Sequence, residues 1–254
     1  MFDASRIFSK KVHSYARYRW DYPDEAIEAI VNEAGISLSS VLADIGAGTG
    51  ILTKAFLDRA GRVYAVEPNL EMRAMAVSEL SGFPSFRAID APAHATTLPD
   101  RSVDVITVGQ AIHWFSPDST LKEFIRILKP GGWLAILRYS SIDEGLDTEE
   151  KRLLSDIFPE KNGFPDPLAR DLPEQKPMNF YFKGYHFAKM DFYRTHKEPW
   201  EEFLGALHSA SNAPDPDHPA YEHFVFAAKK FFDIASRDGL LETKQHTELF
   251  LGQI

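Results

Sequence analysis

Short apolar runs alternate with longer stretches of helical spacing between residues 41 and 139. The first run, Val41 to Ile45, precedes a glycine-rich turn and a stretch in which Leu52, Phe56 and Leu57 fall on one helical face. Repetition of strand, turn and helix is typical of βαβ units, whose parallel sheet is buried on both faces. The pattern therefore predicts an α/β domain.

Further strands and helices continue this rhythm as far as Tyr139. The predicted strands are Arg62 to Glu67, Ser85 to Ile89, Ser102 to Gly109 and Trp133 to Ser140. Asn69 is a candidate N-cap for the helix that follows the second strand. Another helix is predicted near Thr120 to Leu128, and Lys129 to Gly132 predicts a turn before the fifth strand.

The rhythm breaks after Ser140, where prolines and glycines up to about Gln175 predict an insertion or lid with a helix near Glu149 to Ile157. Two later strands, His186 to His196 and His246 to Ile254, flank predicted helices near Trp200 to His208 and Pro219 to Ser236. Because the last strand ends the chain, we expect it to lie antiparallel inside the sheet. The expected fold is doubly wound, with a mostly parallel seven-stranded sheet, helices on both faces and a helical insertion.

A chain of 254 residues with 44% hydrophobic content can bury one full α/β core. We predict a single domain over 1–254, with a cofactor-binding core and N-terminal cover at 1–139. Residues 140–238 form the insertion and substrate region, which includes a sheet strand, and 243–254 form the last strand.

Composition excludes several classes of function. The absence of cysteine rules out disulfides, thiolate metal sites and cysteine nucleophiles, and nothing points to an oxidising compartment. A net charge of -9 disfavours nucleic acid as a partner. The sequence offers neither a signal peptide nor a membrane span, so we expect a cytoplasmic protein.

The glycine-rich turn carries the first functional signal. Gly46, Gly48 and Gly50 follow Asp44 between a strand and a helix, where glycines allow close approach to a ligand. A dinucleotide fingerprint needs its third glycine at position 51, which is Ile51, so an NAD(P)-dependent oxidoreductase loses support. S-Adenosylmethionine lacks a pyrophosphate and suits this spacing.

Two carboxylates accompany the turn. Asp44 can orient the glycine loop or accept a hydrogen bond from the ammonium group of the cofactor. Glu67 closes the second strand 21 residues after Gly46, where it can accept hydrogen bonds from both ribose hydroxyls. The combination is far more specific than either part alone.

The segments VLADIGAGTGILT, YAVEPN, LPDRSVDVITVGQAIHWF and ILKPGGWLAI stand in the order of the motifs of one family. The chain strongly resembles the class I S-adenosylmethionine-dependent methyltransferases, of the type 11-like kind with a Rossmann-like fold. YARYRWDYP and GQAIHWF make it similar to the small-molecule branch that includes trans-aconitate methyltransferase-like proteins. The resemblance implies in-line methyl transfer to a small-molecule acceptor, with a carboxylate as one candidate, and S-adenosylhomocysteine as product.

The predicted cofactor contacts combine this resemblance with the residues themselves: Tyr15, Arg19, Asp44, Gly46, Ala47, Gly48, Glu67, Pro68, Ala93, His94, Gly109 and Gln110. The chain departs from the family where an acidic residue commonly binds the adenine amino group. Pro92 occupies that segment, so adenine is expected on the Ala93 amide and on Asp90 or His94.

Substrate-facing candidates lie near strand ends and in the N-terminal aromatic cluster, and no residue is assigned as catalytic: Tyr18, His113, Trp114, Arg138, Ser209 and Ser211. For the aromatic residues among them, simple packing or a solvated amphipathic helix is the competing interpretation. A hydroxyl or carbon acceptor would need a base such as His113, whereas a carboxylate needs none. The nine histidines show no metal-ligand spacing, so no metal is predicted.

Other functions remain open from sequence alone. A cofactor-binding module without turnover would carry the same motifs, since a fold does not prove catalysis. A protein or nucleic-acid methyltransferase is disfavoured because no Asn-Pro-Pro-Tyr-like block follows the fourth strand.

Overall fold

The computed structural model describes residues 12–142, 148–157, 176–210 and 213–254. The strands are β1 (Val41–Ile45), β2 (Arg62–Val66), β3 (Phe86–Ile89), β4 (Val103–Gly109), β5 (Leu128–Ile142), β6 (Ala188–Glu198) and β7 (Leu241–Gln253). The helices are α2 (Val12–Tyr18), α3 (Asp24–Glu33), α4 (Ile51–Lys54), α5 (Leu70–Leu80), α6 (Pro117–Ile127), α7 (Thr148–Ile157), α8 (Met178–Tyr181), α9 (Trp200–His208) and α10 (Tyr221–Ala235), with a 3-10 turn η1 at Ile112–Trp114.

The strands form one seven-stranded sheet in the order β3-β2-β1-β4-β5-β7-β6. Neighbours from β3 to β5 run parallel, while β7 runs antiparallel to both β5 and β6. The predicted doubly wound sheet with an antiparallel last strand inside it is therefore confirmed. The carboxyl ends of β1, β2 and β4 meet at one edge, where open α/β sheets bind ligands.

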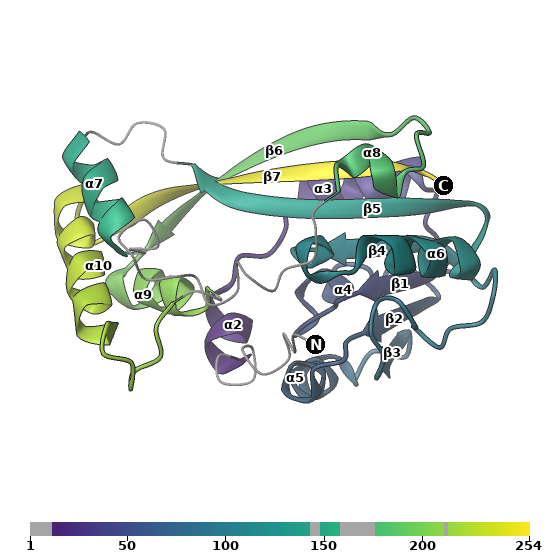
Figure 1. Ribbon diagram of the computed structural model, residues 1–254, viewed down its shortest axis with the longest axis horizontal. Coiled ribbons are helices and arrows are strands. Elements are labelled where there is room, and N and C mark those ends of the chain that lie inside the picture. The colour runs from purple at the N-terminus through teal and green to yellow at the C-terminus, as the bar shows by residue number, and fades with distance from the viewer. Residues whose placement is uncertain (1–11, 143–147, 158–175, 211–212) are drawn as a thin grey trace.

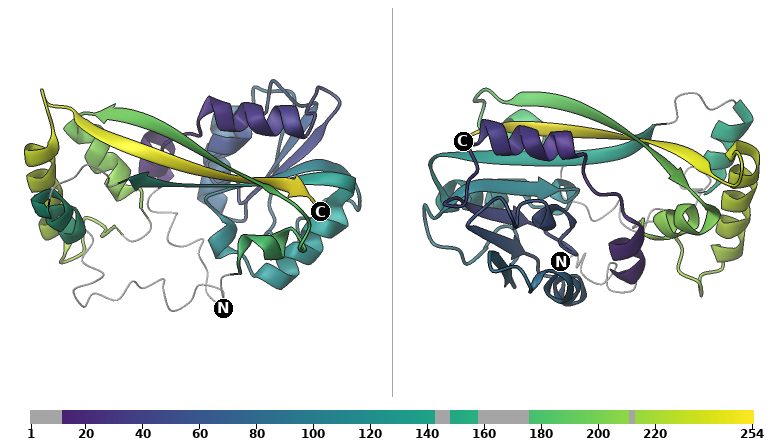
Figure 2. Two further views of the ribbon diagram at one scale, coloured as in Figure 1. Left: turned by 90° about the horizontal axis from the view of Figure 1, so that it is seen from above. Right: turned by 180° about the vertical axis from the view of Figure 1, so that it is seen from behind.

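Helices cover both faces of the parallel half of the sheet (Figure 2). On one face α3, α4 and α5 and their flanking turns bury Ile30, Phe56 and Leu80 against the strands. On the other face α6 and α8 bury Phe124 and Tyr181. Each side chain of this size contributes about 1.5–3 kcal/mol when it leaves water, which fixes the helices on the sheet.

A separate apolar cluster lies at the far end of the long strands β5, β6 and β7 (Figure 1). Phe203 of α9 and Phe231 of α10 pack there with Leu153 of α7 and with Leu241 at the start of β7. The long strands thus connect the parallel core to a helical cluster. The helices predicted near 149–157, 200–208 and 219–236 all belong to this cluster.

Several elements differ from the expectation. The helix after the glycine turn ends at Lys54, and the chain continues to Ala60 in tight turns that still bury Phe56 and Leu57. The turn at Lys129–Gly132 lies inside β5 as an irregularity, because Leu128 already pairs with Val103. The last strand begins at Leu241 rather than near residue 243 or 246, because its pairing with β6 already starts between Leu241 and Glu198.

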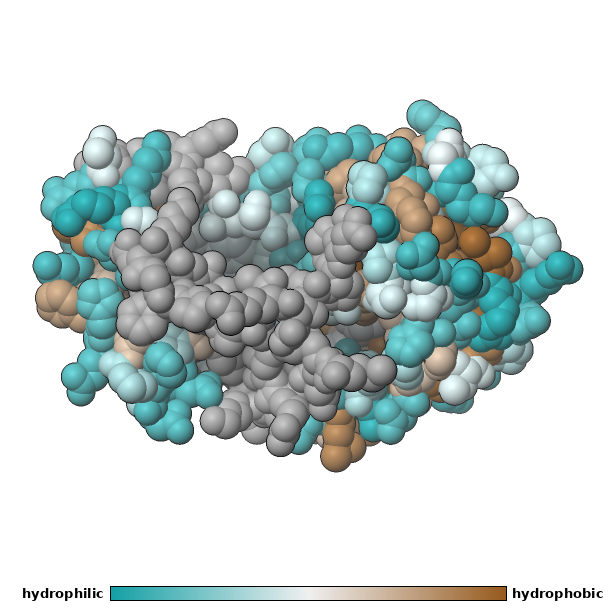
Figure 3. Space-filling model, viewed as in Figure 1, coloured by the Kyte–Doolittle hydropathy of each residue, from teal (hydrophilic) through white to brown (hydrophobic). Residues whose placement is uncertain are grey.

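The N-terminal region and the insertion complete the outline. Helix α2 packs on α9: a side chain at Gly205 would collide with the ring of Tyr18, so α2 is no solvated helix. Much of the predicted insertion falls at 143–147 and 158–175, outside the described residues. Within the described ranges no helix has the length and apolarity to cross a membrane. The face in Figure 3 is mostly hydrophilic, with apolar side chains gathered near α6 and α8.

Candidate active site

The glycine turn after β1 adopts a backbone that favours glycine at all three positions. Gly46, Gly48 and Gly50 have φ of 72°, 57° and 87°. A Cβ on Gly46 would lie 2.7 Å from the Cβ of Ala111, so this position also requires the absence of a side chain. The amides of Gly46 and Ala47 donate to the carbonyl of Val66, which ties the turn to the end of β2.

Asp44 lies beneath this turn and is buried. Its carboxylate accepts hydrogen bonds from Thr53 Oγ1 at 2.6 Å and Thr107 Oγ1 at 3.1 Å. Burial raises the pKa of Asp44 from 3.8 to about 6, against the lowering effect of the two threonine hydroxyls. The side chain thus links the turn to α4 and β4 and also borders the cavity inside the turn.

Glu67 stands at the end of β2 and holds the turn from the other side. Its Oε2 accepts from the Gly48 amide at 2.9 Å, and its Oε1 accepts from the Asn69 amide at 2.8 Å. Burial raises the pKa of Glu67, and the two amides oppose that rise. Each carboxylate oxygen can accept a further hydrogen bond.

A small cavity of about 30 Å³ lies within the turn and is walled by aromatic rings. Tyr15, Trp20, Tyr22 and Tyr139 border it opposite the glycines. Burial raises the pKa of Tyr22, Tyr15 and Tyr139, the last to about 12, so all three hydroxyls are neutral at pH 7. The tyrosine side chains therefore add aromatic surface but no charge to the wall of this cavity.

The end of β4 closes the same cavity. A side chain at Gly109 would collide with the hydroxyl of Tyr22, so the backbone approaches that ring closely. Gln110 has a φ of 52°, an uncommon conformation for a residue other than glycine. The side chain of Gln110 makes two hydrogen bonds to the backbone of Tyr139: its Nε2 donates to the carbonyl at 2.8 Å, and its Oε1 accepts from the amide at 3.1 Å. Gln110 thus fixes the end of β5 beside β4.

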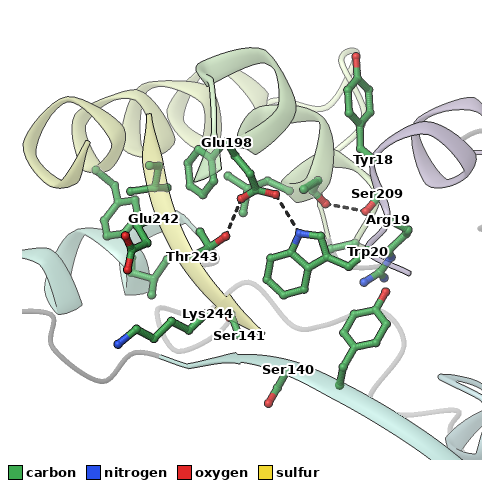
Figure 4. A pocket seen from close by; sticks show the side chains of 18 of the residues that line it. Tyr18, Arg19, Trp20, Ser140, Ser141, Glu198, Ser209, Glu242, Thr243 and Lys244 are labelled. Atoms are coloured by element: carbon green, nitrogen blue, oxygen red, sulfur yellow. Dashed lines mark hydrogen bonds between the residues drawn. The ribbon is translucent and has the colours of Figure 1, made fainter. Parts of the chain in front are cut away.

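A second, larger cavity of about 250 Å³ adjoins this wall on the side of the helical cluster (Figure 4). Trp20 and Tyr139 border both cavities. Leu154, Phe203 and Phe231 provide apolar lining from α7, α9 and α10. The polar and charged residues of its wall include Arg19, Glu198, Ser209, Thr243 and Lys244.

Arg19 borders the larger cavity and contacts two residues of the small one, Tyr15 and Tyr139. Its guanidinium stacks over the Tyr15 ring, 4.9 Å from the centroid, and hydrogen-bonds the hydroxyl of Tyr139. Within the described part of the chain, the buried Nε of Arg19 has no hydrogen-bond partner. Arg19 therefore brings a positive charge to the wall of the larger cavity, beside Tyr139.

Comparison with known proteins agrees with the geometry. A methyltransferase-domain model matches residues 43–136. An uncharacterized methyltransferase of Schizosaccharomyces pombe is 33% identical over 186 residues, which cover 73% of this chain and 69% of that protein. The chain belongs to the class I S-adenosylmethionine-dependent methyltransferases.

Other relatives and structures of methyltransferases extend the comparison. An uncharacterized methyltransferase of Mycobacterium bovis is 37% identical over 144 residues, which cover 57% of this chain and 56% of that protein. A candidate type II methyltransferase from Anaeromyxobacter dehalogenans has the same fold, with a TM-score of 0.64 at 22% identity over 93% of this chain and 98% of that one.

The structure of this methyltransferase gathers most of the predicted cofactor contacts around the glycine turn. Tyr15, Asp44, Gly46, Ala47, Gly48 and Gly109 border the small cavity, and Glu67 bonds the turn itself. Pro68 follows Glu67 and is exposed. The predicted adenine contacts lie after β3: Ala93 is buried, His94 is exposed, and Asp90 forms an ion pair with Arg73 at 2.8 Å.

The predicted substrate residues separate into two groups. Tyr18 and Ser209 border the larger cavity, and the Ser209 hydroxyl donates to the Ala206 carbonyl at 2.6 Å. Arg138 lies on the other face of the sheet, over the Phe250 ring and paired with Glu248. Ser211 lies outside the described residues.

His113 and Trp114 lie in η1, with ring centroids 5.0 Å apart, and neither borders the two cavities described above. Burial, with the charges of Arg19 and Arg138, lowers the pKa of His113 to about 4. The imidazole is therefore neutral at pH 7 and a weak proton acceptor.

Sequence reasoning missed several residues of the site. Tyr22 stands in the YARYRWDYP segment that was singled out, yet only the fold places its hydroxyl against Gly109. Thr53 and Thr107 hold Asp44 from two different elements. Glu198 carries no local signal except its place before Pro199 at the end of a strand.

Proposed function

We propose that this methyltransferase methylates a small molecule bound in the 250 Å³ cavity, and that a carboxylate is the acceptor group. The observation that carries the proposal is the shared wall: Trp20 and Tyr139 border both this cavity and the glycine-turn cavity. An acceptor in the larger cavity therefore lies next to a cofactor whose methyl group is at the glycine turn. In-line displacement needs this adjacency, with water kept away.

The residues around the turn fit S-adenosylmethionine, which supplies an electrophilic methyl group on a sulfonium. The second lone pairs of Glu67 suit two ribose hydroxyls, and Asp44 suits the ammonium group. The neutral rings of Tyr15, Trp20 and Tyr139 suit a sulfonium, because aromatic faces attract cations. Ala47, Pro68, Ala93, His94, Gly109 and Gln110 remain predicted contacts of the same ligand.

The charges at the junction favour a carboxylate. Arg19 lines the cavity and bonds the hydroxyl of Tyr139, so its positive charge lies beside the shared wall. A carboxylate is already ionised at pH 7 and needs orientation rather than a base. His113, with its pKa near 4, is poorly suited to remove a proton from a hydroxyl or carbon acceptor.

The remaining expectations follow from the same assignment. We propose that residues 140–238 form the substrate region of a single domain, because α7, α9 and α10 from this range line the cavity. The cysteine-free, acidic composition supports a cytoplasmic enzyme whose acceptor is no nucleic acid. We further propose a reaction without a metal; the described residues contain no group of three histidine or carboxylate side chains placed to hold one.

Transfer of a labelled methyl group to a panel of small carboxylic acids tests the proposal. Ala206→Phe fills the cavity wall, so kcat/KM should fall about a hundredfold while the Kd of S-adenosylmethionine stays unchanged. Ala206→Ser, which adds one oxygen atom, is the matched control. Full activity of Ala206→Phe, or methylation of macromolecules only, would contradict a small-molecule acceptor in this cavity.

A further inference from the structure

Glu198 is a buried carboxylate in the wall of the acceptor cavity. It ends β6, directly before Pro199 and α9, and only 6% of the residue is exposed. Figure 4 shows its side chain between Trp20 and Thr243, facing the same space as the apolar lining. Neither the glycine turn nor the proposed methyl transfer to a carboxylate requires this residue.

Among the described residues, neutral groups alone hold Glu198. Trp20 Nε1 donates to Oε1 and Thr243 Oγ1 donates to Oε2, both at 2.8 Å. Within the described ranges no lysine, arginine or histidine forms an ion pair with it. Lys244 is exposed and extends away from it in Figure 4. The imidazole of His196 bonds Gln245.

A buried carboxylate without a cationic partner is costly, because neutral donors compensate only part of the lost hydration. Each oxygen of Glu198 retains one acceptor site beyond its bond to Trp20 or Thr243. The neighbouring wall consists of apolar residues such as Phe203 and Leu241. A positively charged nitrogen on a ligand would compensate the negative charge of Glu198 and donate hydrogen bonds to its free acceptor sites. An anionic group beside Glu198 would be repelled.

We propose that Glu198 selects acceptors that carry a positively charged nitrogen on an apolar body, an inference that rests on the proposed function. The Trp20 ring lies 6.0 Å from the Tyr139 ring, and its Nε1 contacts Glu198. The cationic nitrogen therefore binds beside Glu198, with the indole of Trp20 between it and Tyr139, and apart from the group that receives the methyl. Glu198 determines specificity and transfers no proton.

Titration calorimetry tests whether Glu198 selects a positively charged nitrogen. The full chain is first saturated with S-adenosylhomocysteine. The probes are 4-phenylbutylamine and its uncharged counterpart 4-phenylbutan-1-ol. We expect the amine to bind at least about tenfold more tightly, because a desolvated charge pair forms only with the amine. Glu198→Gln keeps an acceptor for Trp20 and should remove the preference while leaving alcohol binding within about twofold.

Glu222→Gln is the matched control, because it removes the same charge at the exposed start of α10. This variant should still bind the amine more tightly than the alcohol. An unchanged thermal midpoint and unchanged S-adenosylhomocysteine affinity show that Glu198→Gln is folded. The inference is overturned if the two probes bind equally or not at all, if Glu198→Gln keeps the preference, or if Glu222→Gln also loses it. Methyl transfer to carboxylic acids is measured separately, so the proposed function can stand when this inference fails.

Discussion

Replacement of Asp44 by asparagine is expected to stabilise the fold while weakening cofactor binding. Burial holds the folded-state pKa of Asp44 at about 6, above its ordinary 3.8. The protonated form is thus favoured by folding, and this contribution is complete below about pH 4 and lost as the pH rises through 6. At 1.36 kcal/mol per pH unit, a charged Asp44 at pH 8 costs about 3 kcal/mol.

Asparagine removes this charge but keeps one acceptor for Thr53 or Thr107, at a loss of about 1 kcal/mol for the weaker hydrogen bond. A net gain of about 2 kcal/mol at pH 8 corresponds to a Tm about 4–8 °C higher for a chain of this size. At pH 4, where Asp44 is protonated, the gain should be absent and only the loss of about 1 kcal/mol should remain. Thermal unfolding followed by circular dichroism at the two pH values measures both effects.

The functional cost is measured by titration with S-adenosylmethionine. If Asp44 accepts from the cofactor ammonium, Asp44→Asn should raise the Kd about 10–100-fold. Asp104→Asn is the matched control: Asp104, on β4, accepts from the Val41 amide and pairs with Lys129, so its loss should lower stability and leave the Kd unchanged. A lower Tm for Asp44→Asn at pH 8 than at pH 4, relative to the unmodified chain, would refute the reasoning.

Three further outcomes are expected. Glu67→Gln should weaken S-adenosylmethionine binding at least about tenfold in calorimetry and lower Tm, because an amide NH₂ would face the Gly48 N–H; an unchanged Kd would contradict the ribose assignment. Gly46→Ala should cost about 2–4 kcal/mol in urea unfolding, since its Cβ would overlap that of Ala111 at a positive φ; loss below about 0.5 kcal/mol would show that the turn yields. The hydrogen bond from Arg126 lowers the pKa of Glu123 to about 2. The stability that this ion pair contributes is therefore present above about pH 4.5 and lost as the pH falls toward 2, and Glu123→Gln should flatten that part of the pH profile of stability.

Local patterns predicted much of the fold because they follow from short-range physics. The β-branched runs at 41–45 and 103–109 became central strands, and Asn69 caps α5 through its bond to the Met72 amide. The sequence also predicted that the glycine turn follows the first strand and that a carboxylate, Glu67, ends the second. Parallel strands bring their carboxyl ends to one edge, so Asp44 and Glu67 lie at the same edge of the sheet, as expected.

The sequence by itself therefore determined the α/β class, the antiparallel last strand and the place of the glycine turn. Only the tertiary structure decided the proposed acceptor cavity, whose wall joins Trp20, Tyr139, Glu198 and Thr243 from segments far apart in the chain. No periodicity links these positions, because their meeting depends on how far β5, β6 and β7 extend beyond the parallel core and on how the helical cluster packs at their end. Backbone hydrogen bonding is specified locally, whereas a cavity is what long-range packing leaves unfilled.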